Sequence, residues 1–395
     1  MAFNYEINQL ELMQARIKSV PHGWQFTYVG KAFCIRNNLR KPISEEERSM
    51  SPGNYPYYGP TKIQGYIGTF EQDGSYALIG EDGDHFLKFE KHSMTQLVDG
   101  KCTVNNHAHI IEGTKEASRE WFYYYFMHRD IFSFLSRQGA GRYKLNKASL
   151  EKMPLLLPPI VEQKKIAQIL STWDNAISVT EKLLANSQRQ KKALMQQLLT
   201  GKKRLLDENG VRFSGEWRNS TLSMFCNIAK GKALSASDLE VGDFPVIAGG
   251  KSSPYSHSDY THENVVTVSA SGAYAGYISY HNYKIWASDC SVVSAKADNL
   301  IDYFYQLLLS LQDKIYSLQS GGAQPHIYPK DLNSIPLWVP CVKEQQKIAA
   351  VLSAADVEIS TLEKKLACLK DEKKALMQQL LTGKRRVKVD EAIAA

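Results

Sequence analysis

Two segments of this chain are copies of each other, and this duplication limits what the chain can fold into. Residues 158–204 read PPIVEQKKIAQILSTWDNAISVTEKLLANSQRQKKALMQQLLTGKKR, and residues 340–386 read PCVKEQQKIAAVLSAADVEISTLEKKLACLKDEKKALMQQLLTGKRR. The copies align without a gap, and roughly 60% of their positions are identical, so they form an internal repeat. The segments that precede the two copies are much less alike. A repeated scaffold with two divergent domains is typical of a protein that makes two different contacts with one long partner.

Each copy predicts one long helix with a coiled-coil seam. Alternate steps of four and three residues pass through Ile166, Leu170, Trp173, Ile177, Thr180, Leu184, Ser187, Lys191, Leu194 and Leu198 in the first copy, and through Ile348, Leu352, Ala355, Ile359, Leu362, Leu366, Leu369, Lys373, Leu376 and Leu380 in the second. A heptad pattern of this length favours a coiled coil over a generic amphipathic helix. Prolines stand at the start of both copies, and Gly201 and Gly383 mark the helix ends. We therefore expect two helices of about 40 residues, roughly 60 Å long, over 161–200 and 343–382, which pair with each other.

The seam contains polar residues at Thr180, Ser187, Lys191 and Lys373. Polar seam residues can fix the register of a coiled coil at a cost in stability. They can equally mark places where the helices pack against something else. The sequence leaves both interpretations open.

The remaining segments predict two α+β domains with strand-rich cores. Strand-like strings separated by Gly, Asn, Asp and Ser turns are YIGTF, YALIG and HIIEG in the first domain, and VVTVSASG, YAGYISY and CSVVSAK in the second. Each domain then continues into an apolar helix, expected at 121–135 and 303–318, a Gly-rich loop and a Pro-bounded strand. The aromatic run WFYYYF at 121–126 lies inside a predicted helix, which favours core packing over base stacking.

These features divide the chain into five parts. The predicted boundaries are 1–157 for the first domain, 158–204 for the first helix, 205–339 for the second domain, 340–386 for the second helix and 387–395 for a C-terminal tail. At 395 residues the chain is too long for one ordinary core, which agrees with this division.

Composition narrows the class of protein. The formal net charge of +7 permits nucleic-acid binding but is weak support for it. The six cysteines form no CxxC pair, so we expect neither disulfides nor a structural zinc site. The sequence shows no signal peptide and no apolar run that could cross a membrane, so we expect a cytoplasmic protein.

Motifs for catalysis are not found. The sequence has no Gly-x-x-x-x-Gly-Lys-Ser/Thr phosphate loop, and the string NYPYYGP at 54–60 lacks the adjacent prolines of an amino-methyltransferase motif. His107 and His109 lie two residues apart on a predicted strand, where a structural or DNA-facing role is favoured over metal binding. We therefore expect a chain that is not an enzyme and that holds no metal or cofactor.

The arrangement resembles the specificity (S) subunit of type I restriction–modification systems. The resemblance rests on the strings at 162–177 and 344–359, on the ALMQQLLTGKxR ending, and on the duplication, heptads and length together. It implies a fold of two strand-rich target-recognition domains, separated by an antiparallel coiled coil of two long helices with pseudo-twofold symmetry. Each domain would read one half of a bipartite site on double-stranded DNA. The first domain is longer than the second, so the intact site should be asymmetric.

The resemblance also implies partners. Two methyltransferase (M) subunits would bind the helices and the recognition domains, and motor-nuclease (R) subunits would join through them. The helices would set the spacer between the half-sites. The chain itself would need no cofactor, while the partner subunits would use S-adenosylmethionine, ATP and Mg.

Residues that can read base edges or hold phosphates gather in a few loops. Arg, Lys, Asn, Gln and Ser side chains suit these tasks, and glycines let a backbone approach DNA closely. In the first domain the candidates are Arg36, Asn38, Arg40, Lys62, Gln64, Arg137, Gln138, Arg142, Tyr143 and Lys144. In the second domain they are Lys230, Lys232, Lys251, Ser252, Tyr255, Ser271, Gln319, Gln324 and His326.

Other functions remain open at this point. A stand-alone two-domain DNA-binding regulator would bind specific DNA without a partner. A coiled-coil adaptor that binds only protein would have no salt-dependent affinity for DNA. A self-contained restriction or modification enzyme is disfavoured by the missing motifs.

Overall fold

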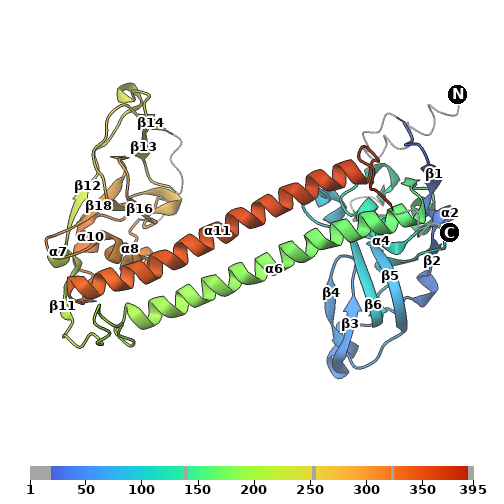
Figure 1. Ribbon diagram of the computed structural model, residues 1–395, viewed down its shortest axis with the longest axis horizontal. Helices are drawn as coiled ribbons and strands as arrows, with labels where there is room; N and C mark the ends of the chain where they lie inside the picture. The colour runs from blue at the N-terminus through green and yellow to red at the C-terminus, as the bar shows by residue number, and fades with distance from the viewer. Residues whose placement is uncertain (1–18, 138–140, 251–254, 322–323, 390–395) are drawn as a thin grey trace. The chain divides into compact units, whose positions relative to one another are not determined.

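The computed structural model describes residues 19–137, 141–250, 255–321 and 324–389 (Figure 1). The chain divides into two compact units. Unit 1 consists of Met1–Val179 and Leu366–Ala395, and unit 2 of Thr180–Lys365. Two long helices, α6 (Ile160–Leu198) and α11 (Val342–Leu380), contribute residues to both units. Each has 39 residues, as the heptad pattern predicts.

Unit 1 is built on a six-stranded sheet. The strand order is β2 (Cys34–Ile35), β7 (Ala108–Glu112), β5 (Gln72–Gly80), β6 (Thr95–Val104), β3 (Pro52–Tyr58) and β4 (Ile63–Ile67). Two short antiparallel pairs accompany it, β1 (Gln25–Tyr28) with β10 (Pro154–Leu157) and β8 (Ser136–Arg137) with β9 (Tyr143–Lys144). The short helices are α2 (Val29–Ala32), α3 (Glu45–Met50), α4 (Arg119–Phe126) and α5 (Lys147–Glu151), with 3₁₀ turns at Asn37–Leu39, Asp84–Lys88 and Phe132–Phe134.

Unit 2 has a smaller set of strands. A four-stranded sheet has the order β12 (Cys226–Lys230), β18 (Cys290–Ala295), β15 (Val265–Ser269) and β16 (Ile278–His281). A three-stranded sheet has the order β14 (Ser256–His257), β13 (Phe244–Ile247) and β17 (Trp286–Ala287), and β11 (Arg218–Thr221) pairs with β19 (Pro336–Val339). The short helices are α7 (Leu222–Phe225), α8 (Ile301–Ser310), α9 (Gln312–Tyr316) and α10 (Pro329–Asn333), with 3₁₀ turns at Ala236–Asp238 and Gly272–Tyr274.

The aromatic run on α4 lies in the core of unit 1, as predicted. Trp121, Phe122, Tyr125 and Phe126 are each at most 1% exposed. The indole N–H of Trp121 donates to the carbonyl of Leu156, 3.0 Å away, so its polar atom is satisfied inside the core. Base stacking by these four rings is therefore excluded.

The apolar helices expected in the two domains are shorter than predicted. In unit 1 the helix ends at Phe126 instead of Leu135, and a 3₁₀ turn follows after Asp130. The Asp130 carboxylate accepts from the backbone N–H of Phe132, and this side-chain bond offers the backbone an alternative to continuing the helix. In unit 2 the predicted helix is interrupted at Leu311, so that α8 and α9 are separate.

The seams of α6 and α11 are confirmed. All twenty predicted seam residues are buried or half-buried. In unit 1, Lys373 of α11 lies 2.5 Å from the Asp174 carboxylate of α6. In unit 2, Lys191 of α6 is paired with Asp356 of α11. The start of each helix therefore lies beside the end of the other, which makes the pairing antiparallel.

Candidate nucleic-acid interface

In each unit the start of one helix is bonded to the segment after the other helix by the same three residue types, a glutamate, an arginine and a tryptophan. In unit 1 the Glu162 carboxylate accepts from Arg386 Nε and Nη2, both at 2.7 Å, and from Trp24 Nε1 at 3.0 Å. In unit 2 the Glu344 carboxylate accepts from Arg204 Nε at 2.6 Å and Nη2 at 2.7 Å, with Trp217 Nε1 at 3.3 Å. We call these sets the end locks. The guanidinium pKa of both arginines is raised by the hydrogen bonds to the glutamates.

The glycine turn after each helix delivers the arginine of the end lock. Gly201 and Gly383 have φ of +69° and +68°, values that favour glycine. A Cβ atom at Gly383 would collide with the ring of Pro21, so the turn also has no room for a side chain. The ending LLTGKxR is therefore a helix stop that points its last arginine back at the other helix.

Each strand-rich domain also holds the helix seam through one side chain. In unit 1, Tyr124 donates from its hydroxyl to Asp174 Oδ2 at 2.7 Å, while Lys373 pairs with the other oxygen of Asp174. In unit 2, Gln306 donates to Asp356 Oδ2, also at 2.7 Å. Lys191 and Lys373 each bind an aspartate of the facing helix, and that aspartate also binds the domain that packs on the seam. Both interpretations that the sequence left open therefore apply at these two lysines, the second one through the aspartates.

The loops at one edge of the unit 1 sheet bring several predicted residues together. Lys62 lies in the turn between β3 and β4, Gln64 lies at the start of β4, and Asn105 donates to Gln64 Oε1 at 3.1 Å. The turn at Asn105 continues to His107, whose Nδ1 lies 2.8 Å from Asp82. Asp82 in turn forms a bridge with Lys144 of β9. We call this set of loops, which carries Lys62, Gln64, Arg137, Arg142, Tyr143 and Lys144, polar face 1.

Glu81 is the internal anchor of polar face 1. Its carboxylate pairs with Arg40 and lies 3.2 Å from Lys144 Nζ, and His109 Nε2 is 3.9 Å away. The hydrogen bonds from the two cations, together with His109, outweigh burial and lower the pKa of Glu81. Arg40 also donates to the carbonyls of Asn37, Asn106 and Ala108, so it stabilises the loops from inside.

Among the other candidates of the first domain, Arg36 and Asn38 are not part of polar face 1. Arg36 is half-exposed and pairs with Glu112 at 2.6 Å, and Asn38 is exposed in the 3₁₀ turn beside it. Arg137 stacks its guanidinium over the Tyr143 ring, 5.0 Å from the centroid, within the β8–β9 hairpin. Gln138 lies outside the described residues.

His107 and His109 have different surroundings. His107 is in the turn before β7, and it is half-exposed. The side chain of His109 is 1% exposed, with Nδ1 2.8 Å from Asn37 and Nε2 2.7 Å from the Leu145 carbonyl. Burial lowers the pKa of His109. Among the described residues, no group of His, Cys, Asp and Glu side chains is arranged to hold a metal ion.

In unit 2 two loops meet and bring four predicted residues together. Ser271 and Ser320 each form a β-bridge with His326. Gln319 donates to the Ala275 carbonyl at 2.8 Å, the His326 ring stacks on Tyr328 with centroids 6.0 Å apart, and Gln324 is exposed. Ser271 donates its hydroxyl to Asp289. We call this set, Ser271, Asp289, Gln319, Gln324 and His326, polar face 2.

The remaining candidates of the second domain lie apart from this set. Lys230 is exposed at the end of β12, and Lys232 stands over the Trp286 ring, 4.8 Å from its centroid. Tyr255 is 56% exposed beside β14. Lys251 and Ser252 lie outside the described residues.

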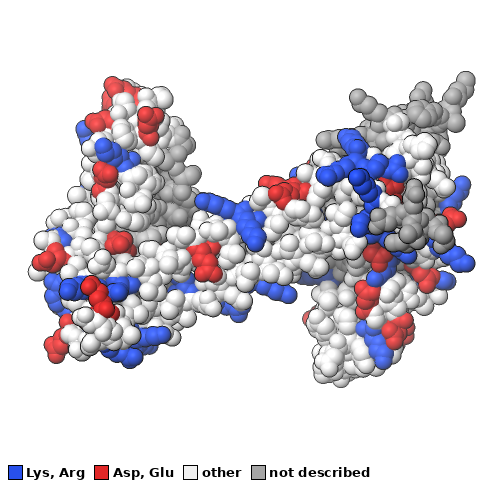
Figure 2. All heavy atoms as spheres, in the orientation of Figure 1, with Lys and Arg blue, Asp and Glu red and all other residues white. Residues whose placement is uncertain are grey.

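The positive charge of the chain is concentrated on the helices. Residues 205–339 contain 9 Lys and Arg against 13 Asp and Glu, whereas residues 158–204 and 340–386 together contain 19 against 9. Figure 2 shows Lys and Arg side chains along α6 and α11 and mixed signs over the strand-rich part of unit 2. The helical segments are therefore better suited to bind phosphates than the second domain is.

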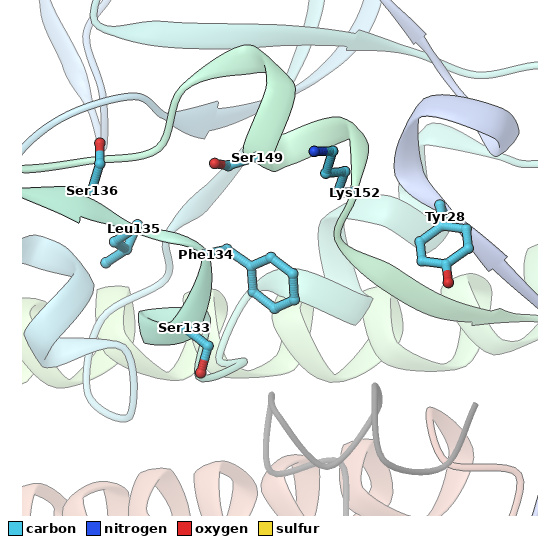
Figure 3. A pocket seen from close by; sticks show the side chains of 7 residues that line it. All are labelled: Tyr28, Ser133, Phe134, Leu135, Ser136, Ser149 and Lys152. Carbon is cyan, nitrogen blue, oxygen red and sulfur yellow. The ribbon is translucent and has the colours of Figure 1, made fainter. Parts of the chain in front are cut away.

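A hollow of about 430 Å³ lies beside the β8–β9 hairpin in unit 1 (Figure 3). Its lining residues are Tyr28, Ser133, Phe134, Leu135, Ser136, Ser149 and Lys152. Its one charged lining residue is Lys152, and the lining has no carboxylate, histidine or cysteine, so it lacks an acid–base or nucleophile–base pair.

Glu81, Asp289 and the end locks were not among the sequence candidates. The candidates were chosen because they are cations, amides or hydroxyls in loops. This choice omits the carboxylates that hold those loops in place. A signal for the end locks is present in the sequence, because the Glu and the Arg recur at the same place in both copies.

Comparison with known proteins agrees with this architecture. Residues 7–186 and 214–370 match the family model described as the type I restriction modification DNA specificity domain. A putative type I restriction enzyme specificity subunit from Haemophilus influenzae is 27% identical over 340 residues, which cover 80% of this chain and 84% of that protein. The type I restriction enzyme MjaVIII specificity subunit from Methanocaldococcus jannaschii is 25% identical, and the alignment covers 98% of each chain.

The fold has a solved counterpart. The crystal structure of a type I restriction–modification system S subunit from M. genitalium superposes with a TM-score of 0.70 at 18% identity, over 93% of this chain and 96% of that chain. Among the described residues no helix is both long and apolar enough to cross a membrane. The predicted fold class is confirmed, and the chain belongs to the type I restriction–modification DNA specificity family, as its sequence predicts.

Proposed function

We propose that this chain is the non-catalytic subunit that selects the DNA sequence for a type I restriction–modification complex. Each strand-rich domain reads one half of a bipartite, asymmetric site, and the paired helices set the spacer and dock the methyltransferase subunits. The observation that carries this proposal is the combination of a duplicated pair of helices with two unlike polar faces. We call the pair, α6 and α11 with their end locks, the frame. Family membership supports it, because specificity subunits work together with other restriction–modification subunits.

The chemistry of the polar faces suits reading rather than catalysis. Polar face 1 offers exposed Arg142 and half-exposed Lys144, which suit phosphates and guanine, and the amide of Gln64, which suits adenine. Polar face 2 offers Gln324, His326 and Ser271. In both faces some of these side chains, among them Gln64, Gln319 and Ser271, are held by hydrogen bonds within the loops, an arrangement that fixes the direction in which their donors and acceptors point.

The methyl transfer and the DNA translocation then belong to partners. We propose two methyltransferase subunits, which use S-adenosylmethionine, and motor-nuclease subunits, which use ATP and Mg. The exposed basic residues of α6 and α11, which outnumber the acidic ones there, offer these subunits, or the DNA phosphates, a mainly basic surface.

The test is to express the chain with and without a methyltransferase subunit of a type I system from the same genome and to map methylated positions in host DNA. We expect methylation at one bipartite asymmetric sequence only when both proteins are present. Methyl transfer by the purified chain alone would contradict a non-catalytic role. Tight, specific binding to DNA by the chain without any partner would instead support a stand-alone regulator.

A further inference from the structure

Two loop carboxylates, one in each polar face, have opposite surroundings. Glu81 in unit 1 is neutralised by Arg40 and Lys144. Asp289 in unit 2 has no cation within ion-pair distance among the described residues. A carboxylate that is held in place without a counterion retains its capacity to accept hydrogen bonds from a ligand.

The position of Asp289 is fixed from several sides. It lies between β17 and β18, and its backbone carbonyl accepts from Ala270 N–H at 3.2 Å. Its Oδ2 accepts from the Ser271 hydroxyl. Gly249, with φ of +68°, passes so close that a Cβ there would lie 3.3 Å from Oδ2. The second oxygen, Oδ1, has no hydrogen-bond partner in the described part of the chain, and the residue is only half-buried.

Asp289 also lies within polar face 2. Ser271, which holds its carboxylate, is bridged to His326, and the neighbouring loop carries Gln324. A carboxylate at a DNA surface repels the phosphates, so it is tolerated only where it meets a hydrogen-bond donor. In the major groove the base-edge donors are the amino groups of cytosine N4 and adenine N6.

Building on the proposed function, we propose that Asp289 reads the amino group of a cytosine or an adenine in the half-site of the second domain. Oδ1 accepts the hydrogen bond, and Ser271 is a positioning residue that keeps the carboxylate in one rotamer. Glu81 has no corresponding role, because its oxygens already serve Arg40 and Lys144.

The test is the Asp289→Asn variant in complex with the methyltransferase subunit. Asparagine keeps the shape but can present an N–H₂ donor where the carboxylate presented an acceptor. Bound duplexes are selected from a library randomised across both half-sites. We expect binding to the original site to fall about 5-fold to 150-fold, which corresponds to roughly 1–3 kcal/mol. One position of the second half-site should shift from cytosine or adenine towards guanine or thymine, with the first half-site unchanged.

Two further variants complete the experiment. Asp298→Asn makes the same charge change beyond the other end of β18, at an exposed residue, and should leave the selected sequence unchanged. Ser271→Ala should relax the same single position more weakly than Asp289→Asn does, which a purely structural role of Ser271 would not do. Wild-type base preference in the folded Asp289→Asn complex would overturn the proposal, as would an equal loss of affinity for all sequences. If the wild-type complex selects no sequence, the proposed function itself fails.

Discussion

In unit 1 the Glu162 carboxylate is held by Arg386 and Trp24, and in unit 2 the Glu344 carboxylate is held by Arg204 and Trp217 in the same way. The correspondence continues at the seam, where Lys373–Asp174 and Lys191–Asp356 are equivalent pairs. The strands above these contacts differ. Unit 1 has a six-stranded sheet, and unit 2 has a four-stranded and a three-stranded sheet.

The charges of the two domains differ as well. Residues 1–157 contain 19 Lys and Arg against 17 Asp and Glu, whereas acidic residues outnumber basic ones in residues 205–339. The contacts that hold the frame together are thus duplicated, and the surfaces that the frame presents are not. This difference teaches that assembly and readout are assigned to separate sets of residues, so one set can change without the other.

The largest effect is expected from shortening the frame. Deleting one heptad from each helix, Thr180–Asn186 and Leu362–Cys368, preserves the seam pattern and both Lys–Asp pairs. Each helix becomes roughly 10 Å shorter. At about 3.4 Å per base pair, this length corresponds to about three base pairs of the DNA spacer. We expect binding to the original site to be lost and a shorter spacer with unchanged half-sites to be selected from a spacer library. A deletion in one helix only should disrupt the seam and serves as the control. An unchanged spacer in the folded double deletion would show that the helices do not set it.

The next effect is on stability and compares the two end locks. Arg386→Ala and Arg204→Ala each leave a buried glutamate without its cation, since the side chains of Glu162 and Glu344 are only 4% and 1% exposed. Each variant should lose about 3 kcal/mol in the free energy of unfolding. Urea denaturation measures the loss, and hydrogen exchange should locate it in unit 1 for Arg386→Ala and in unit 2 for Arg204→Ala.

Replacing the glutamate as well provides the control for the end locks. Glu162→Gln in the Arg386→Ala background removes the unpaired charge and should restore part of the stability. A loss below 0.5 kcal/mol in either single variant, within the error of such measurements, would show that the duplicated lock is not needed in that unit.

The smallest effect concerns single loop residues. Arg142→Ala in polar face 1 and Gln324→Ala in polar face 2 should each weaken specific binding by roughly 1–3 kcal/mol if the side chain reads a base. A phosphate contact would instead weaken binding to all sequences alike and lower the salt dependence. Affinity measurements at several salt concentrations on cognate and scrambled duplexes separate the two. No change in either quantity would remove that residue from the interface.

The frame could be predicted from the sequence, because its signals are periodic and duplicated. All twenty residues that the heptad steps identified are buried or half-buried, and the glycines after Thr200 and Thr382 located the helix ends. The acid partners of Lys191 and Lys373 could not be predicted, because they lie on the other helix and are far away in the sequence. The helix predicted to Leu135 ends early, at Phe126. The apolar residues that follow predict a longer helix, but the Asp130 carboxylate accepts a hydrogen bond from the Phe132 N–H and favours a turn there.

The polar faces could be predicted only by residue type. Arg40 and Lys144 were both selected as cations in loops, yet both are tied to Glu81, and Arg40 also bonds three backbone carbonyls. Which loop side chains point outward depends on tertiary pairings such as the bridge between Ser271 and His326. The DNA-contact role of the named loop residues stays a prediction.

Exchange of one domain tests the separation of assembly from readout most directly. Residues 1–157 are replaced by the corresponding domain of a relative with a different target, while Trp24 and Tyr124, which bind the helices, are kept. Methylation mapping of the chimaera with its methyltransferase subunit should show a new first half-site, the original second half-site and the original spacer. A target in which both halves change would contradict the account, because the two domains would then not read independently.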